Sequence, residues 1–104
     1  MICVIASIRV REGARDAFLE IFNANVPAVL RESGCLEYFP SVDVDAALPV
    51  QKLDDRVVTI IEKWQSLEAL REHLRAPHML DYKEKVKDLV EDVSLKVLQE
   101  AMQL

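Results

Sequence analysis

Both histidines and the only tryptophan of this 104-residue chain lie within one short stretch, together with a glutamate and a tyrosine. The residues are Glu62, Trp64, His73, His78 and Tyr82. A histidine with an ordinary pKa of about 6.5 can accept a phenolic proton at neutral pH. A tryptophan ring offers a flat surface on which an aromatic ligand can stack. The stretch therefore predicts a base beside an aromatic binding surface.

Each of these residues also has a structural interpretation. His73 borders an apolar helical stripe, where a histidine often serves as a hydrogen-bonded core residue. Trp64 is equally compatible with core packing, and His78 could cap a helix start instead of lining a pocket. Glu62 shares a strand face with Trp64, so a buried Glu62 would need a partner such as a backbone amide or an arginine. A metal site built from both histidines and a carboxylate is disfavoured, because Pro77 breaks the helical face that they would share.

A series of strands and helices has to position these side chains. Runs rich in β-branched and other apolar residues predict four strands, over residues 2–10, 35–44, 56–65 and 93–97. Apolar residues at helical spacing predict three helices, over residues 14–32, 66–75 and 77–91. The coarse order β-α-β-β-α-β is that of the split βαβ, ferredoxin-like arrangement, with one antiparallel sheet and helices on one face. The predicted fold class is therefore α+β.

Several local features follow from residue type. Pro27 should kink or locally break the long helix, and Gly34 should follow its end in a left-handed conformation. Pro40 suggests an edge position or a bulge in the second strand, on which Leu36 and Tyr38 should share a face. Ser66 should cap the next helix. The stripes expected to be buried are Ala14, Ala17, Phe18, Ile21, Phe22, Val29 and Leu30 in the long helix, Leu67, Leu70 and Leu74 in the short helix, and Met79, Tyr82, Val86, Leu89 and Val90 in the last helix.

The predicted sheet has apolar residues on both faces, most clearly at residues 2–5 and 57–61. Helices on one side would leave the other face bare, and a large bare apolar face usually marks an interface. We therefore expect a homodimer packed sheet to sheet. Residues 45–55 show the least regular pattern of apolar residues, so we expect a loop there. We expect residues 101–104 to form a tail.

Composition favours one globular domain, spanning residues 1–104, because 51% of the residues are hydrophobic and only two are glycine. A net charge of −5 argues against nucleic acid or an anionic membrane as a partner. Cys3 and Cys35 lie in apolar surroundings and form no CxxC motif, which favours reduced thiols. The first residues contain no basic leader and no run of membrane-spanning length, so we expect a cytoplasmic location.

Several stretches together carry a family resemblance, namely residues 4–9, 32–40, 61–66, 70–74 and 77–82. Their combined pattern reads E-x-W-x-S, then L-x-x-H-L-x-x-P-H-M-x-x-Y. With this pattern the chain resembles the antibiotic biosynthesis monooxygenase (ABM) family of dimeric ferredoxin-like proteins, and most closely its quinol monooxygenase branch. The resemblance implies a dimeric α/β barrel.

The resemblance also implies an activity, because members of the family oxidise or oxygenate phenols and quinols with O2 and without metal or flavin. The expected function is therefore that of a cofactor-free monooxygenase or oxidase acting on a small quinol or polyphenol, with no resident metal. The sequence contains no glycine-rich phosphate loop or nucleophile elbow that would indicate another chemistry. The expected site comprises His73 and Glu62 as catalytic residues and Trp64, Tyr38, His78 and Tyr82 as substrate-binding residues.

Other family members degrade haem or isomerise small carbonyl compounds. Haem-degrading members use an asparagine, a tryptophan and an iron-ligating histidine at positions that match Ser7, His73 and Lys83 here, so haem degradation is not expected. Two alternatives stay open. One is a non-catalytic dimer that binds an apolar ligand, and the other is a carbonyl isomerase of the same fold with a histidine–carboxylate pair.

Overall fold

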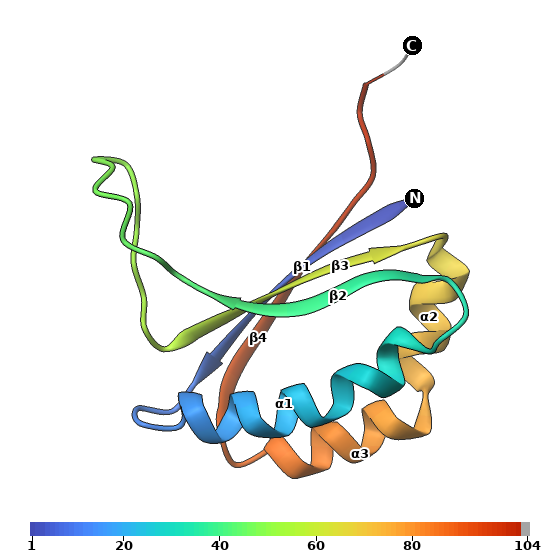
Figure 1. Ribbon diagram of the computed structural model, residues 1–104, viewed down its shortest axis with the longest axis horizontal. Helices are drawn as coiled ribbons and strands as arrows, with labels where there is room; N and C mark the ends of the chain where they lie inside the picture. Colours follow the sequence, from blue (N-terminus) through green and yellow to red (C-terminus); the bar gives the residue numbers. More distant parts are fainter. Residues whose placement is uncertain (103–104) are drawn as a thin grey trace.

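A computed structural model describes residues 1–102 of the chain. The elements are, in order, β1 (Ile2–Val10), α1 (Arg15–Leu30), β2 (Cys35–Val42), β3 (Val57–Trp64), α2 (Leu67–Arg75), α3 (Pro77–Val86) and β4 (Val90–Leu98). The strands form one antiparallel sheet in the order β2-β3-β1-β4. Figure 1 shows α1 and α3 side by side against one face of this sheet, with α2 at the end of β3. The predicted ferredoxin-like α+β fold is confirmed.

The helix-covered face of the sheet is built by alternation along the two central strands. In β1 the even-numbered residues from Ile2 to Val10 are all buried, and the odd-numbered ones are half-buried. The register pairs Val4 with Glu62 and Ile2 with Trp64. Because paired residues of an antiparallel sheet share a face, Glu62 and Trp64 both point toward the helices. The main core therefore lies between this face and the helical layer.

Most predicted element boundaries agree with the structure to within a few residues, but the boundary between the last helix and the last strand does not. Helix α3 ends at Val86, and β4 begins at Val90. The reason is that the sheet pairs Val90 with Val10 and the amide of Arg11 donates to Leu89 O at 2.9 Å. Some residues that helical spacing had assigned to the last helix therefore belong to β4, because they pair with β1 instead.

Other local expectations have mixed outcomes. Helix α1 runs through Pro27 without a break, since a proline removes only one donor and the next turn still bonds to Pro27 O. Strand β2 lies at an edge of the sheet, as Pro40 suggested, but the register shifts between Cys35 and Glu37. Leu36 falls within this shift and is exposed, so it does not share the buried face of Tyr38.

The buried helical faces are narrower than predicted. In α1, Phe18, Phe22 and Val29 are buried, whereas Ala17 and Leu30 are exposed. In α2 the buried pair is Leu70 and His73, and Leu67 and Leu74 are both exposed. A helix with only one neighbouring surface buries one narrow stripe, and here that stripe includes the histidine. The buried residues predicted for α3 are confirmed at Met79, Tyr82 and Val86.

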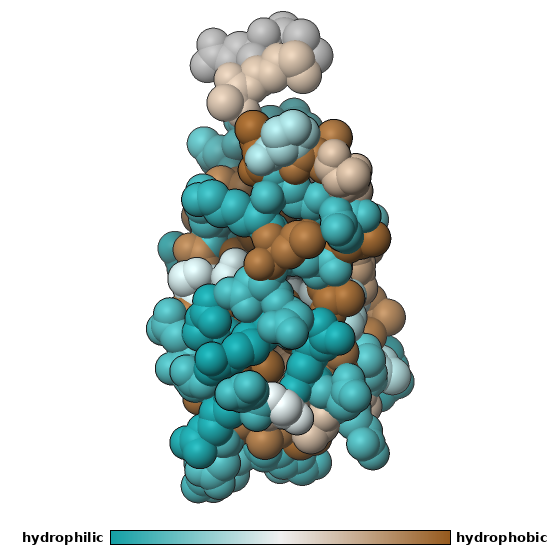
Figure 2. Space-filling model, turned by 90° about the vertical axis from the view of Figure 1, so that its left-hand side faces the viewer, coloured by the Kyte–Doolittle hydropathy of each residue, from teal (hydrophilic) through white to brown (hydrophobic). Residues whose placement is uncertain are grey.

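Residues 43–56 contain no strand or helix and extend away from the helical layer (Figure 1), as the lack of pattern predicted. The segment is held by side chains: Arg9 pairs with Asp54, and Asp43 accepts from the amide of Asp54 at 2.8 Å. Figure 2 views this side of the molecule and shows hydrophobic residues scattered among hydrophilic ones. Of the predicted tail, Ala101 and Met102 have no regular structure, and residues 103–104 lie outside the described part. Within residues 1–102, no helix is long and apolar enough to span a membrane.

Candidate active site

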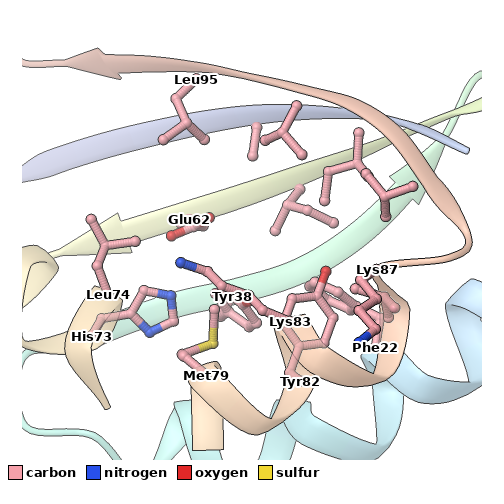
Figure 3. A pocket seen from close by; sticks show the side chains of 16 residues that line it. Phe22, Tyr38, Glu62, His73, Leu74, Met79, Tyr82, Lys83, Lys87 and Leu95 are labelled. Carbon is pink, nitrogen blue, oxygen red and sulfur yellow. The ribbon is translucent and has the colours of Figure 1, made fainter. Parts of the chain in front are cut away.

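A cavity of about 450 Å³ lies between the sheet and the last two helices (Figure 3). Its walls are mostly apolar and come from all four strands and from α1, α2 and α3. The polar groups that reach it are Tyr38, Glu62, His73, Tyr82, Lys83 and Lys87. Apolar cavities of this size with a few polar groups are typical of sites for small molecules.

His73 is the buried histidine of this cavity, and only 1% of it is exposed. Its Nδ1 lies 2.8 Å from Oε2 of Glu32. The imidazole packs against the Trp64 ring, with centroids 4.5 Å apart, and against the edge of Tyr38. Figure 3 shows one ring nitrogen of His73 directed toward the interior of the cavity. Since Nδ1 is engaged by Glu32, the nitrogen that faces the cavity is Nε2.

Glu32 reaches His73 because of the turn that follows α1. Its backbone amide bonds to Val29 O at 2.9 Å, and Gly34 continues the turn with a φ of +88°. The carbonyl of Gly34 accepts from the amide of Gln65 at 2.8 Å, which ties the turn to the start of α2. A Cβ on Gly34 would lie 2.6 Å from the Cβ of Ala69, so only glycine allows this approach.

Burial lowers the pKa of His73, and the neighbouring groups act in both directions. The hydrogen bond and the charge of Glu32 raise the pKa, whereas the charges of His78 and Lys83 lower it. Burial is the largest of these effects, so the net shift is downward. His73 is therefore neutral at pH 7, with a lone pair available on Nε2 for a proton.

Glu62 is buried on β3, and its partner differs from the expected backbone amide or arginine. The indole Nε1–H of Trp64 donates to Glu62 Oε1 at 2.9 Å, between two residues on the same strand face. Burial raises the pKa of Glu62 to about 7, although the indole bond lowers it and the charge of Glu32 raises it. The carboxyl group therefore exists in both protonation states near neutral pH.

Tyr38 and Tyr82 form an aromatic wall with Phe22. The Phe22 ring stacks on Tyr38 with centroids 5.3 Å apart and meets Tyr82 edge-on at 5.6 Å. Burial raises the pKa of both tyrosine hydroxyls well above its usual range, so both stay protonated. Both residues line the cavity, and a protonated hydroxyl can donate to a bound molecule.

The structure brings together four of the six predicted site residues in the cavity: His73, Glu62, Tyr38 and Tyr82. Trp64 does not line it, because its ring is fully buried behind His73. His78 also lies outside it, and its Nε2 is 2.7 Å from Glu32 Oε2. Trp64 and His78 therefore do not line this cavity, and their assignment as substrate-binding residues stays a prediction.

The sequence interpretation assigned no role to Glu32, although it belongs to one of the quoted stretches. The need of a buried histidine for a partner on Nδ1 was the available signal, but sequence distance hid which carboxylate supplies it. Lys83 was considered only for haem ligation, yet it lines the cavity. Among residues 1–102 there is no group of three or more histidine, cysteine or acidic side chains placed to hold a metal ion.

The arrangement is suited to removing a proton from an aromatic hydroxyl. Neutral Nε2 of His73 can accept the proton, tyrosine hydroxyls can donate to the resulting oxyanion, and the mostly apolar walls suit an aromatic ring. Glu62 offers a second proton acceptor or donor with a pKa of about 7 on the opposite, sheet side of the cavity.

The chain is similar to several known proteins. Over 101 residues the chain is 42% identical to "Probable quinol monooxygenase YgiN" of Escherichia coli K12, covering 95% of this chain and 97% of that protein. Among solved structures, PA3566 from Pseudomonas aeruginosa superposes with a TM-score of 0.81 at 25% identity, covering 97% of this chain and 94% of that one. Rv0793 from Mycobacterium tuberculosis gives a TM-score of 0.80 at 27% identity, covering 98% and 96%.

The family model described as antibiotic biosynthesis monooxygenase matches residues 1–85, which include the cavity-lining residues from Ala6 to Lys83. Since that match extends over most of the chain and the identity to the E. coli relative extends over nearly all of it, this chain belongs to the antibiotic biosynthesis monooxygenase family.

Proposed function

We propose that this protein is a cofactor-independent monooxygenase or oxidase that uses O2 on a small quinol or polyphenol. The observation that carries the proposal is the neutral, buried His73, anchored through Nδ1 and facing an apolar cavity of about 450 Å³. The 42% identity to a protein named as a quinol monooxygenase supports the substrate class.

In the proposed reaction, Nε2 of His73 removes the proton from one quinol hydroxyl, and the electron pair of that O–H bond stays on the oxygen. The resulting quinolate is a much better electron donor to O2 than the neutral quinol. Oxidation of the quinol to the quinone then supplies the two electrons that reduce O2 to hydrogen peroxide. If one oxygen atom is instead inserted into the ring, the products are a hydroxyquinone and water.

The other polar groups have proposed roles that follow from their positions. Tyr38 and Tyr82 would donate hydrogen bonds to substrate oxygens, because their hydroxyls stay protonated and both residues line the cavity. Glu62 would exchange a proton with the bound substrate, since its pKa of about 7 allows both states. Glu62 and His73 both contact Trp64, so the two groups would act on the same end of the substrate.

We also propose that the protein is a homodimer that buries the face of the sheet without helices. This face carries half-buried apolar residues on adjacent strands, including the directly paired Ile5 and Ile61 and the exposed Phe39 opposite Ile61. Cross-strand apolar pairs left facing water favour association with a matching surface.

An oxygen electrode tests the proposed activity directly. The protein is added to a panel of small quinols in air-saturated buffer, with heat-denatured protein as the control for spontaneous oxidation. We expect O2 consumption above the control for at least one quinol. Consumption equal to the control across the panel would contradict the proposal. Saturable binding without turnover would then indicate a binding protein, and O2-independent conversion of a carbonyl substrate would indicate an isomerase.

A further inference from the structure

We infer that Glu32 and His78 form a positioning unit with His73, in which one carboxylate oxygen keeps the proton of His73 on Nδ1 and leaves Nε2 unprotonated toward the cavity. The inference rests on the proposed function for its catalytic meaning, but the geometry stands without it. Neither Glu32 nor His78 would touch the substrate, since neither lines the cavity.

The main observation is that both histidines bond to the same atom. Oε2 of Glu32 lies 2.8 Å from His73 Nδ1 and 2.7 Å from His78 Nε2. A carboxylate oxygen accepts and cannot donate, so at these distances each facing nitrogen must carry the hydrogen. The opposite tautomer of His73 would place a nitrogen lone pair against a carboxylate lone pair. The network therefore selects the tautomer that a general base on the cavity side needs.

The three side chains come from three different elements, which makes the arrangement rigid. Glu32 follows α1, His73 lies near the end of α2 and His78 lies in the first turn of α3. Exposure of the side chains rises outward, from 2% at His73 through 13% at Glu32 to 29% at His78. His78 thus holds Glu32 from the solvent side while His73 holds it from the cavity side.

Because His73 and His78 share one oxygen of Glu32, a change at His78 should alter the pKa of His73. The charged and titratable groups around His73 are Glu32 from the turn after α1, Tyr38 from β2, Glu62 from β3, and His78 and Lys83 from α3. Of these, Glu32 raises the pKa of His73, whereas His78 and Lys83 lower it. Removing Glu32 and removing His78 should therefore shift the titration of His73 in opposite directions.

The experiment compares the full-length wild type with Glu32→Gln, His78→Phe and the control Glu72→Gln. Glu72 is a good control because it lies on α2, is exposed and, within residues 1–102, pairs only with Arg75. Nitrogen-15 NMR of labelled imidazoles gives the tautomer and titration midpoint of each histidine, independently of activity. His73→Gln assigns the His73 signals, and O2 uptake with a responsive quinol gives the pH–rate profile.

We expect wild-type His73 to carry its proton on Nδ1. Glu32→Gln should lower the His73 midpoint, mix its tautomers and reduce turnover about tenfold or more, because part of the general-base contribution is lost. His78→Phe should raise the midpoint and keep the Nδ1–H tautomer, because Glu32 still accepts from Nδ1. Glu72→Gln should change none of these quantities.

The inference is overturned if wild-type His73 carries its proton on Nε2, or if Glu32→Gln leaves tautomer and midpoint as Glu72→Gln leaves them. It is also overturned if Glu32→Gln and His78→Phe shift the midpoint in the same direction. Should Glu32→Gln fail to fold, the wild-type tautomer and the His78→Phe shift still decide the question. If the NMR results are as expected but no quinol is oxidised, the proposed function fails while the positioning unit stands.

Discussion

Trp64 donates its indole N–H to Glu62 at 2.9 Å, and both residues are buried on the helix-covered face of β3. This bond indicates a supporting role for the tryptophan. Its ring lies behind His73 and outside the cavity, so it supports two polar groups of the site from behind. A ligand bound in the cavity would meet the tyrosines and Phe22 instead.

Replacing Trp64 tests this supporting role. Trp64→Phe keeps an aromatic ring behind His73 but leaves Glu62 without its donor, which should cost about 1–3 kcal/mol of unfolding free energy. Affinity for a non-reactive aromatic ligand should change less than stability does. Urea unfolding followed by circular dichroism gives the first quantity and calorimetric titration the second. A large loss of affinity with unchanged stability would instead favour a stacking role.

Replacing His73 tests the general base. His73→Ala should lower turnover of a responsive quinol by about a hundredfold or more, the usual contribution of a general base. In the wild type, the rate should fall on acidification only below pH 6.5, because burial lowers the pKa of His73 from that ordinary value. Stopped-flow or steady-state measurement of O2 uptake gives both the loss of turnover and the pH dependence of the rate. Wild-type turnover in His73→Ala would show that the base is another group.

Glu62→Gln should stabilise the protein at high pH and much less at low pH. The native carboxyl has a pKa raised from 4.5 to about 7, so the native state binds more protons than the unfolded state between these values. The contribution of Glu62 to the free energy of unfolding of the wild type therefore falls as the pH rises from 4.5 to about 7, by a total on the order of 3 kcal/mol. The neutral amide avoids this loss and can still accept from Trp64.

The measurement for Glu62→Gln is the difference in melting temperature between variant and wild type at pH 5 and at pH 8. The difference should grow in favour of the variant toward pH 8. Taking the difference cancels the contribution of His73, whose lowered pKa destabilises the native state in the opposite, acidic direction. A constant difference across this range would show that Glu62 titrates normally.

The two glycines of the chain provide a matched test of the turn that carries Glu32. Both have positive φ, +78° at Gly13 and +88° at Gly34, but a Cβ on Gly13 meets nothing within 4 Å. Gly13→Ala should therefore cost only the left-handed backbone penalty, about 1–2 kcal/mol. Gly34→Ala should cost about 1–3 kcal/mol more, because its Cβ collides with Ala69. Equal losses in chemical denaturation would refute the close approach of α2.

Ile5→Asp tests the homodimer. A charge at this position faces the bare side of the sheet between Ile61 and Lys96, and removing it from water in an apolar interface would be costly even beside the lysine. Light scattering should show a dimer for the wild type and a monomer or unfolded chain for Ile5→Asp. Leu80→Asp is the control, since Leu80 is exposed on α3, among the helices. A wild-type monomer at micromolar concentration would contradict the proposal.

Much of the fold could be predicted from local pattern. The alternation in β1, the capping Ser66 and the positive φ of Gly34 each depend on residues a few positions apart, so the sequence displays them directly. The ends of α3 and β4 could not be placed in this way. They depend on pairing between Val10 and Val90, which are distant in the chain.

The candidate site divides in the same way. The sequence by itself predicted His73 and Glu62 as the polar groups of the site and Tyr38 and Tyr82 as candidates for its walls, and all four line the cavity. Only the tertiary structure decided that Trp64 and His78 stand behind the cavity and that Glu32 joins the two histidines. Residue type limits what a side chain can do, but which of its atoms face a cavity depends on how separate elements pack. Here that packing brings the turn after α1 against the start of α3, and it gives His73 its free nitrogen.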